Sequence, residues 1–199
     1  MFTDGVFAII ITILVLEIEV PPDLSESSLR DALGDVGPTL LAWVISFLIT
    51  GMYWVWHRDL FSQIRLVNRD MVWLNLLFLM PVALVPFASS VLGDYYDDAV
   101  GLHVYGTVLI VVNLMRMALY SYAMRHPQLL WAAPTDRARR QGFLIASAPI
   151  VVYILAMLLA DPAPTASLIL FLALPLLYFL LITVLRQGSG TSAEADDFA

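Results

Sequence analysis

The chain has 199 residues, of which 60% are hydrophobic, and its mean hydropathy is +0.83. This apolar content is well above the roughly 45–50% of a soluble domain, so composition excludes an ordinary soluble protein and predicts an integral membrane protein. The lack of cysteine excludes disulfides and thiolate metal sites, and the net charge of −7 comes mostly from carboxylates in two loops and the C-terminal tail.

Six segments are long and apolar enough to cross a bilayer, which takes about 20 mostly apolar residues per helix. They lie at about 2–18, 38–57, 71–92, 101–124, 141–160 and 163–186. A signal peptide is the alternative for the first segment, but no basic region precedes it and no small-residue cleavage site follows it. The sequence therefore predicts an all-α integral membrane protein, with one six-helix domain over residues 1–187.

Prolines and glycines separate these segments. Pro21 and Pro22 follow the first segment, and Gly37 and Pro38 precede the second. Because proline inside a helix removes a backbone donor, three interior prolines predict bends in the third and sixth spans: Pro81, Pro86 and Pro175. The polar, acidic segment 188–199 contains Gly and Ser and is predicted to be a disordered tail.

The distribution of arginine predicts the orientation in the membrane. All basic residues are arginine, and most of them lie in the loops after the second and fourth spans and at the end of the sixth: Arg58, Arg65, Arg69, Arg125, Arg137, Arg139, Arg140 and Arg186. The other three loops contain most of the acidic residues outside the tail, with Arg30 as their single arginine. Because positive loops stay in the cytoplasm, we expect both termini to be cytoplasmic and the acidic loops to face outside.

Three of the charged or titratable residues within the predicted spans or at their ends need an explanation, because such groups are costly there and usually functional. Asp4 lies in the first turn of the first span, where a helix-capping role is equally open. Arg116 lies deep in the fourth span, and we expect it to pair with a carboxylate or to extend towards the interface. His57 ends the second span beside Arg58, where a solvated interfacial histidine is the simpler interpretation.

The sequence contains no recognisable enzyme motif. HExxH, GxSxG and P-loop patterns are absent, and no cluster of carboxylates lies within a span. We therefore predict that the chain is not an enzyme, that it has no catalytic residues, and that it needs no metal or other cofactor. Tryptophans near the span ends, including Trp54 and Trp56, are typical of the membrane interface and need no ligand.

Several residues of the first span share one side of the helix. Ile9, Ile13 and Leu16 are spaced i, i+4 and i+7 and share one side of a helix, with Thr12 beside them. Every side of this helix is apolar, so periodicity alone favours packing against lipid or against other helices. The pattern by itself leaves the role of this side open.

The stretch FTDGVFAI, with Thr12 after it, resembles the FSD motif of the transmembrane protein 175 family, whose members are potassium channels of bacteria, archaea and animal endolysosomes. The match is strongest from Phe2 to Leu16. The segments WHRDLF and LNL fit the family's second and third helices, and the six-helix layout extends the resemblance over nearly the whole chain. The sequence departs from the motif at Thr3, which replaces the usual serine but keeps the hydroxyl, and the motif's upstream arginine would fall before Met1.

The resemblance implies a potassium-selective channel without a TVGYG filter. Its narrowest rings would be formed by three apolar side chains of the first helix: Ile9, Ile13 and Leu16. A hydroxyl near this constriction would come from Thr12. A hydrogen-bonded network at the cytoplasmic end would comprise the motif residues and two residues downstream: Phe2, Thr3, Asp4, His57 and Asn75.

The resemblance also implies an assembly and a location. One helix per subunit cannot enclose a pore, so several copies must surround an axis. The family's bacterial type implies a homotetramer in a prokaryotic cell membrane, with the bilayer and potassium ions as partners and no nucleic acid. The alternative is a secondary transporter of a small ion or solute, which would require a matched pair of broken helices that the sequence does not contain. A membrane scaffold without ion flux is a third class.

Overall fold

The computed structural model describes the backbone of residues 2–18 and 36–193, and the side chains of these residues up to position 180. The described chain is almost entirely helical, and its helices follow the six predicted segments. In chain order the elements are α1 (Phe2–Ile13), the 3-10 helix η1 (Leu14–Glu17), α3 (Gly37–Ser62), α4 (Arg69–Val82), α5 (Val85–Asp94), α6 (Ala99–Arg125), the 3-10 helix η2 (Pro127–Leu129), α7 (Asp136–Leu159) and α8 (Pro164–Ala193).

Four of the six segments are long and apolar enough, by length and composition, to cross a membrane. They are α3, the pair α4 and α5 taken together over Arg69–Asp94, α6 and α7. The described apolar part of α8, Pro164–Leu180, is shorter, and so is α1 with η1. The fold is therefore that of an all-helical membrane protein, and its first helix is the shortest of the six segments among the described residues.

The third span is bent where we expected proline to interrupt it. Pro81 lies in the last turn of α4, and Pro86 lies in the first turn of α5. Between the two helices the backbone N–H of Ala83 donates to Leu79 (3.0 Å) and that of Leu84 donates to Pro81 (3.1 Å). The chain therefore passes from α4 to α5 through a tight turn rather than a loop, and the two short helices occupy one span.

Side chains before several helices accept hydrogen bonds from the otherwise unpaired N–H groups of the first turn. Asn68 accepts from the N–H of Met71 at the start of α4, and Thr135 accepts from the N–H of Ala138 at the start of α7. Pro38 lies in the first turn of α3, where its missing N–H has no cost. These residues define where three of the helices begin.

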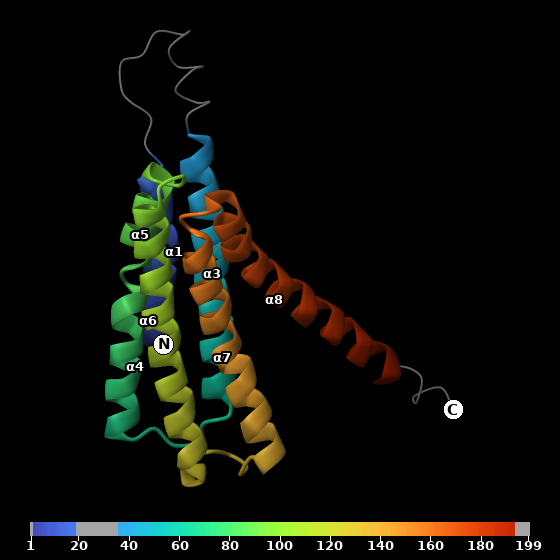
Figure 1. The fold of residues 1–199 in the computed structure, drawn as a ribbon. Helices are drawn as coiled ribbons and strands as arrows, with labels where there is room; N and C mark the ends of the chain where they lie inside the picture. The colour runs from blue at the N-terminus through green and yellow to red at the C-terminus, as the bar shows by residue number, and fades with distance from the viewer. Residues whose placement is uncertain (1, 19–35, 194–199) are drawn as a thin grey trace, which may run out of the picture.

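The helices form an elongated bundle around α6 (Figure 1). α6 packs against α4, α5, α7 and α8, whereas α1 packs against α3, α4 and α5. Figure 1 also shows α8 diverging from the bundle towards its C-terminal end. α8 continues to Ala193, past residue 188 where we predicted the tail to begin, because extending an existing helix avoids the cost of nucleating one. The rest of the predicted tail, 194–199, lies outside the described residues.

The two arginine-rich loops lie at the same end of the bundle and are joined by backbone hydrogen bonds (Figure 1). The N–H groups of Arg65 and Leu66 both donate to the carbonyl of Leu129, at 2.7 and 3.1 Å, and the N–H of Trp131 donates to Gln63 at 3.0 Å. Ile64 and Leu130 form an isolated antiparallel bridge at this contact. The loops after the second and fourth spans are therefore one connected surface.

Candidate pore-facing surface of the first helix

The first helix has one side covered by its own subunit and one side uncovered. Phe7, Ile10 and Leu14 are at most 5% exposed, and Thr3 is 9% exposed. These positions follow an i, i+4, i+7, i+11 pattern, which places them on one side of the helix. The bulky side chains that the bundle leaves uncovered are Phe2 (68%), Ile9 (59%), Ile13 (39%), Val15 (49%) and Leu16 (69%). The three residues that we expected to line a pore are thus all on the uncovered side.

Thr12 lies on the uncovered side beside Ile9 and Ile13. Its hydroxyl donates to the backbone carbonyls of Ala8 and Ile9, both at 2.9 Å, so its single proton is shared within the helix. A hydroxyl whose proton is engaged in this way can offer only oxygen lone pairs to anything outside the helix. Thr12 therefore presents an acceptor oxygen among the uncovered apolar side chains.

Thr3, His57 and Asn75 are joined by hydrogen bonds across three helices. The Asn75 amide on α4 donates from Nδ2 to Thr3 Oγ1 on α1 (3.0 Å), and its Oδ1 lies 2.8 Å from His57 Nε2 on α3. An amide oxygen only accepts, so His57 Nε2 carries the proton in this arrangement. The chain of bonds connects the covered side of α1 to α4 and, through Asn75, to α3.

His57 is buried rather than solvated, which corrects the simpler interpretation of a histidine at the water interface. Its side chain is 6% exposed, because aromatic rings from three helices surround it. The imidazole stacks on Phe61 at 4.2 Å between ring centroids and is nearly parallel to Phe78 at 5.8 Å. Phe7 of α1 contacts it at 6.3 Å. The surrounding rings are apolar, and the hydrogen bond to Asn75 orients the imidazole.

Asp4 has a partner that we did not expect. Trp54 on α3 donates its indole N–H to Asp4 Oδ1 at 3.0 Å. We expected Trp54 at the membrane interface. It lies three residues before His57 and hence on a similar side of α3, and this spacing is the signal in the sequence that places Trp54 near the motif residues. Phe2, the remaining motif residue, is 68% exposed and lies on the uncovered side, apart from the Thr3, Asn75 and His57 contacts.

Arg116 neither pairs with a carboxylate nor extends to the interface, which corrects our expectation. It is 4% exposed, and its Nη2 donates to the backbone carbonyl of Ala146 on α7. The guanidinium carbon also lies 4.8 Å from the ring centroid of Trp56 on α3. A carbonyl and a ring face take the place of a carboxylate because the facing stretches 38–57 and 141–159 contain no acidic residue.

These features define a class of protein: a helical membrane protein whose first helix packs against its neighbours on one side and leaves an apolar side uncovered. Among the described residues no three His, Asp or Glu side chains are grouped to hold a metal ion.

The model of the family described as endosomal/lysosomal potassium channel TMEM175 matches residues 1–86. A potassium channel of Streptomyces collinus is 39% identical over 153 residues, which cover 73% of this chain and 74% of that one. The chain therefore belongs to the TMEM175 family, a family of ion channels and not of enzymes.

A solved structure and an animal relative extend this comparison. The crystal structure of a lysosomal potassium-selective channel TMEM175 homologue from Chamaesiphon minutus superimposes with a TM-score of 0.77 at 26% identity, covering 90% of this chain and 93% of that one. The mouse endosomal/lysosomal proton channel TMEM175 is 31% identical over 175 residues, which are 81% of this chain but 35% of the mouse protein. In length, the chain therefore matches the bacterial relatives, and it spans about a third of the animal one.

Proposed function

We propose that this protein is a potassium channel, in which ions pass along the uncovered side of α1. The observation that supports this proposal is the division of α1 into two sides. The bundle covers Phe7 and Ile10 and leaves Ile9, Ile13 and Leu16 open. A helix side that contacts only lipid needs nothing but apolar side chains. The open side of α1 also carries an oxygen-bearing residue, Thr12, among its apolar side chains. The relatives named as potassium channels give the same assignment.

The proposal requires several subunits, because a single α1 cannot enclose a path for ions. We assign a homotetramer, with the open sides of four α1 helices facing a common axis, as the resemblance to the family's bacterial type implies. In that arrangement Ile9, Ile13 and Leu16 each contribute one apolar ring. Narrow apolar rings control conduction by losing water, and a ring of Thr12 oxygens replaces part of the hydration shell of a cation that enters.

The hydrogen bonds of the motif give the proposed pore its geometry. Asn75 holds Thr3 on one side and His57 on the other, and Trp54 holds Asp4. Together these bonds tie α1 to α3 and α4 and prevent it from rotating about its own axis. A rotation of one residue, about 100°, would replace Ile9 by Ile10 on the open side. We therefore propose that the network sets which side chains face the ions.

For the orientation, we propose cytoplasmic termini and a cytoplasmic location of the arginine-rich surface. The support is that two arginine-rich loops, separated by three helices in sequence, share one end of the bundle through the bonds from Arg65, Leu66 and Trp131. Their arginines therefore act together as one positive surface, which the cytoplasmic side of a membrane favours. The proposed location is the cell membrane of a prokaryote.

The test of the channel assignment is ion flux into liposomes that contain the purified protein. We expect a passive potassium flux larger than the sodium flux, and we expect Ile9→Asn to raise total flux and to weaken the preference, because a polar ring keeps water in the constriction. Ile169→Asn is the matched control, because Ile169 on α8 has nearly the same exposure (60%) as Ile9 (59%) but lies on another helix. Equal behaviour of the two variants would contradict the assignment of the pore to α1.

Flux kinetics separate the channel from the alternative of a secondary transporter. A transporter of the broken-helix type would show interrupted helices in corresponding positions of two repeats. Within the described residues, the third span is divided into α4 and α5, and α8 continues unbroken past Pro175. A flux that saturates at low potassium concentration and requires a second, coupled ion would support the transporter instead.

A further inference from the structure

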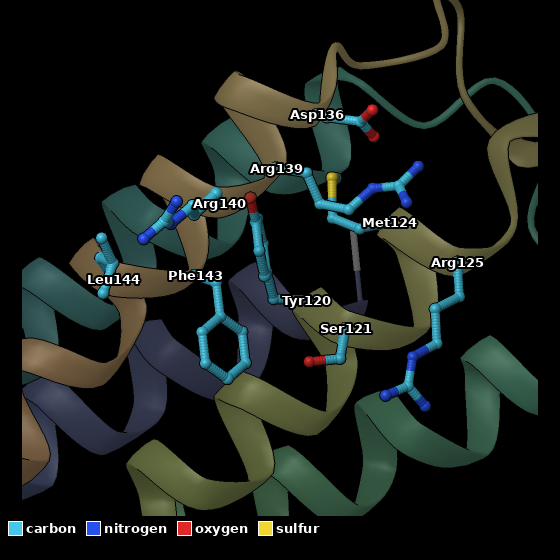
Figure 2. A pocket seen from close by; sticks show the side chains of 9 residues that line it. All are labelled: Tyr120, Ser121, Met124, Arg125, Asp136, Arg139, Arg140, Phe143 and Leu144. Carbon is cyan, nitrogen blue, oxygen red and sulfur yellow. The ribbon is translucent and has the colours of Figure 1, made fainter.

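A cavity of about 420 Å³ lies between the end of α6 and the beginning of α7, and no residue of α1 lines it. Figure 2 shows it, with Tyr120 projecting from α6 towards the first turns of α7. Three arginines line the cavity, Arg125 from the last turn of α6 and Arg139 and Arg140 from α7. One carboxylate, Asp136, also lines it, so that the formal charge around the cavity is positive.

Apart from Ser121, the remaining wall of the cavity is apolar and aromatic. Tyr120 and Phe143 form part of it, and Phe143 is 45% exposed although it is a large apolar residue. Gly142 allows Tyr120 to approach α7 closely, because a side-chain carbon at that position would collide with the Tyr120 hydroxyl. The close approach of α6 and α7 at this glycine shapes one wall, and the three exposed arginines belong to the rest of the lining.

The position of the cavity relative to the predicted spans explains why one part of its lining is charged and another part is apolar. Its aromatic residues fall where the fourth and fifth predicted spans, about 101–124 and 141–160, reach the arginine-rich end of the bundle. Arg125, Arg139 and Arg140 are exposed and lie just outside these limits. Relative to the predicted spans, the cavity therefore extends from the charged loop end to the first residues of the apolar segments.

We propose that this cavity binds the phosphate-bearing headgroup of an anionic phospholipid from the leaflet on the arginine-rich side. Guanidinium groups present paired N–H donors that match two oxygens of a phosphate, which suits arginine better than lysine for this contact. Phe143 and Tyr120 would contact the glycerol region and the first carbons of the acyl chains. A free phosphate ion shares the charge but would leave this apolar wall unused, and for that reason we assign the site to a lipid.

The experiment measures the binding of a fluorescent phosphatidylglycerol to the detergent-solubilised full chain. Unlabelled phosphatidylglycerol should compete, whereas phosphatidylcholine with the same acyl chains and inorganic phosphate should compete poorly. Arg140→Gln should weaken binding about fivefold, which is roughly the effect of one basic residue near an anionic lipid surface. Arg137→Gln is the matched control, because it removes the same charge from the same turn of α7 at a residue that does not line the cavity.

A variant with the opposite expected effect distinguishes a change at the site from damage to the fold. Asp136→Asn removes the carboxylate from the cavity and should strengthen binding, which a misfolded protein would not do. Equal loss in Arg137→Gln and Arg140→Gln would show attraction to the whole positive surface and would overturn the proposal. Competition by inorganic phosphate as effective as that by phosphatidylglycerol would assign the site to a free anion and would overturn the lipid assignment. Ion flux enters none of these readouts, so they are independent of the channel assignment.

Discussion

The two sides of α1 make a sharp prediction about stability, which compares Ile9→Ala with Ile10→Ala. The residues are adjacent and identical, but Ile10 is 5% exposed within the bundle and Ile9 is 59% exposed. Truncation of a buried isoleucine to alanine costs about 2–5 kcal/mol in soluble proteins, through lost transfer free energy and through the cavity that remains. In a membrane protein, lipid is as apolar as the core, so the cavity and the lost packing supply most of the cost. We therefore expect about 2 kcal/mol for Ile10→Ala, at the lower end of that range.

Thermal unfolding of the purified protein in detergent measures this difference. For a chain of roughly 150–250 residues, 1 kcal/mol shifts the Tm by about 2–4 °C, so Ile10→Ala should lower the Tm by about 4–8 °C. Ile9→Ala should change the Tm by no more than about 2 °C, because surface substitutions usually stay within about 0.5 kcal/mol. In liposomes the order should reverse, with Ile9→Ala changing potassium flux more than Ile10→Ala does. A Tm loss as large for Ile9→Ala as for Ile10→Ala would refute the assignment of covered and uncovered sides.

Three further predictions follow from the network and from the proposed assembly. Asn75→Ala removes the partner of both His57 and Thr3, and because leaving a buried polar group unpaired costs about 1–3 kcal/mol, we expect a lower Tm and a weaker ion preference in flux assays. Single cysteines introduced at Glu26 and Arg137 should react differently with an impermeant thiol reagent in intact cells, the first labelled and the second protected; the reverse pattern would overturn the proposed orientation. Finally, the mass of the protein extracted in mild detergent should be that of four chains, and a stable monomer or dimer would argue for the transporter.

Much of the fold could be predicted from the sequence because membrane spans are determined by local composition. A stretch of about 20 apolar residues must form a helix in a bilayer, since each backbone N–H and C=O has to be paired within the segment. This rule located all six helical segments, and proline chemistry located the bend between Val82 and Val85 in the third span. The resemblance of the stretch from Phe2 to Leu16 similarly led to the TMEM175 family, to which the matched residues 1–86 and the relatives assign the chain.

The contacts between helices could not be predicted in the same way, because every side of an apolar helix satisfies the same composition rule. The sequence of α1 left its sides equivalent, and only the packing of Phe7 and Ile10 against α3, α4 and α5 decided which side is open. Likewise, Arg116 contacts the carbonyl of Ala146 and the ring of Trp56, and Asp4 accepts a hydrogen bond from Trp54. The partners in these contacts are far apart in the chain, so the sequence does not indicate them. Sequence spacing determines which residues share a side of one helix. Which of these sides is covered depends on how the neighbouring helices pack against it, and that packing exists only in the assembled bundle.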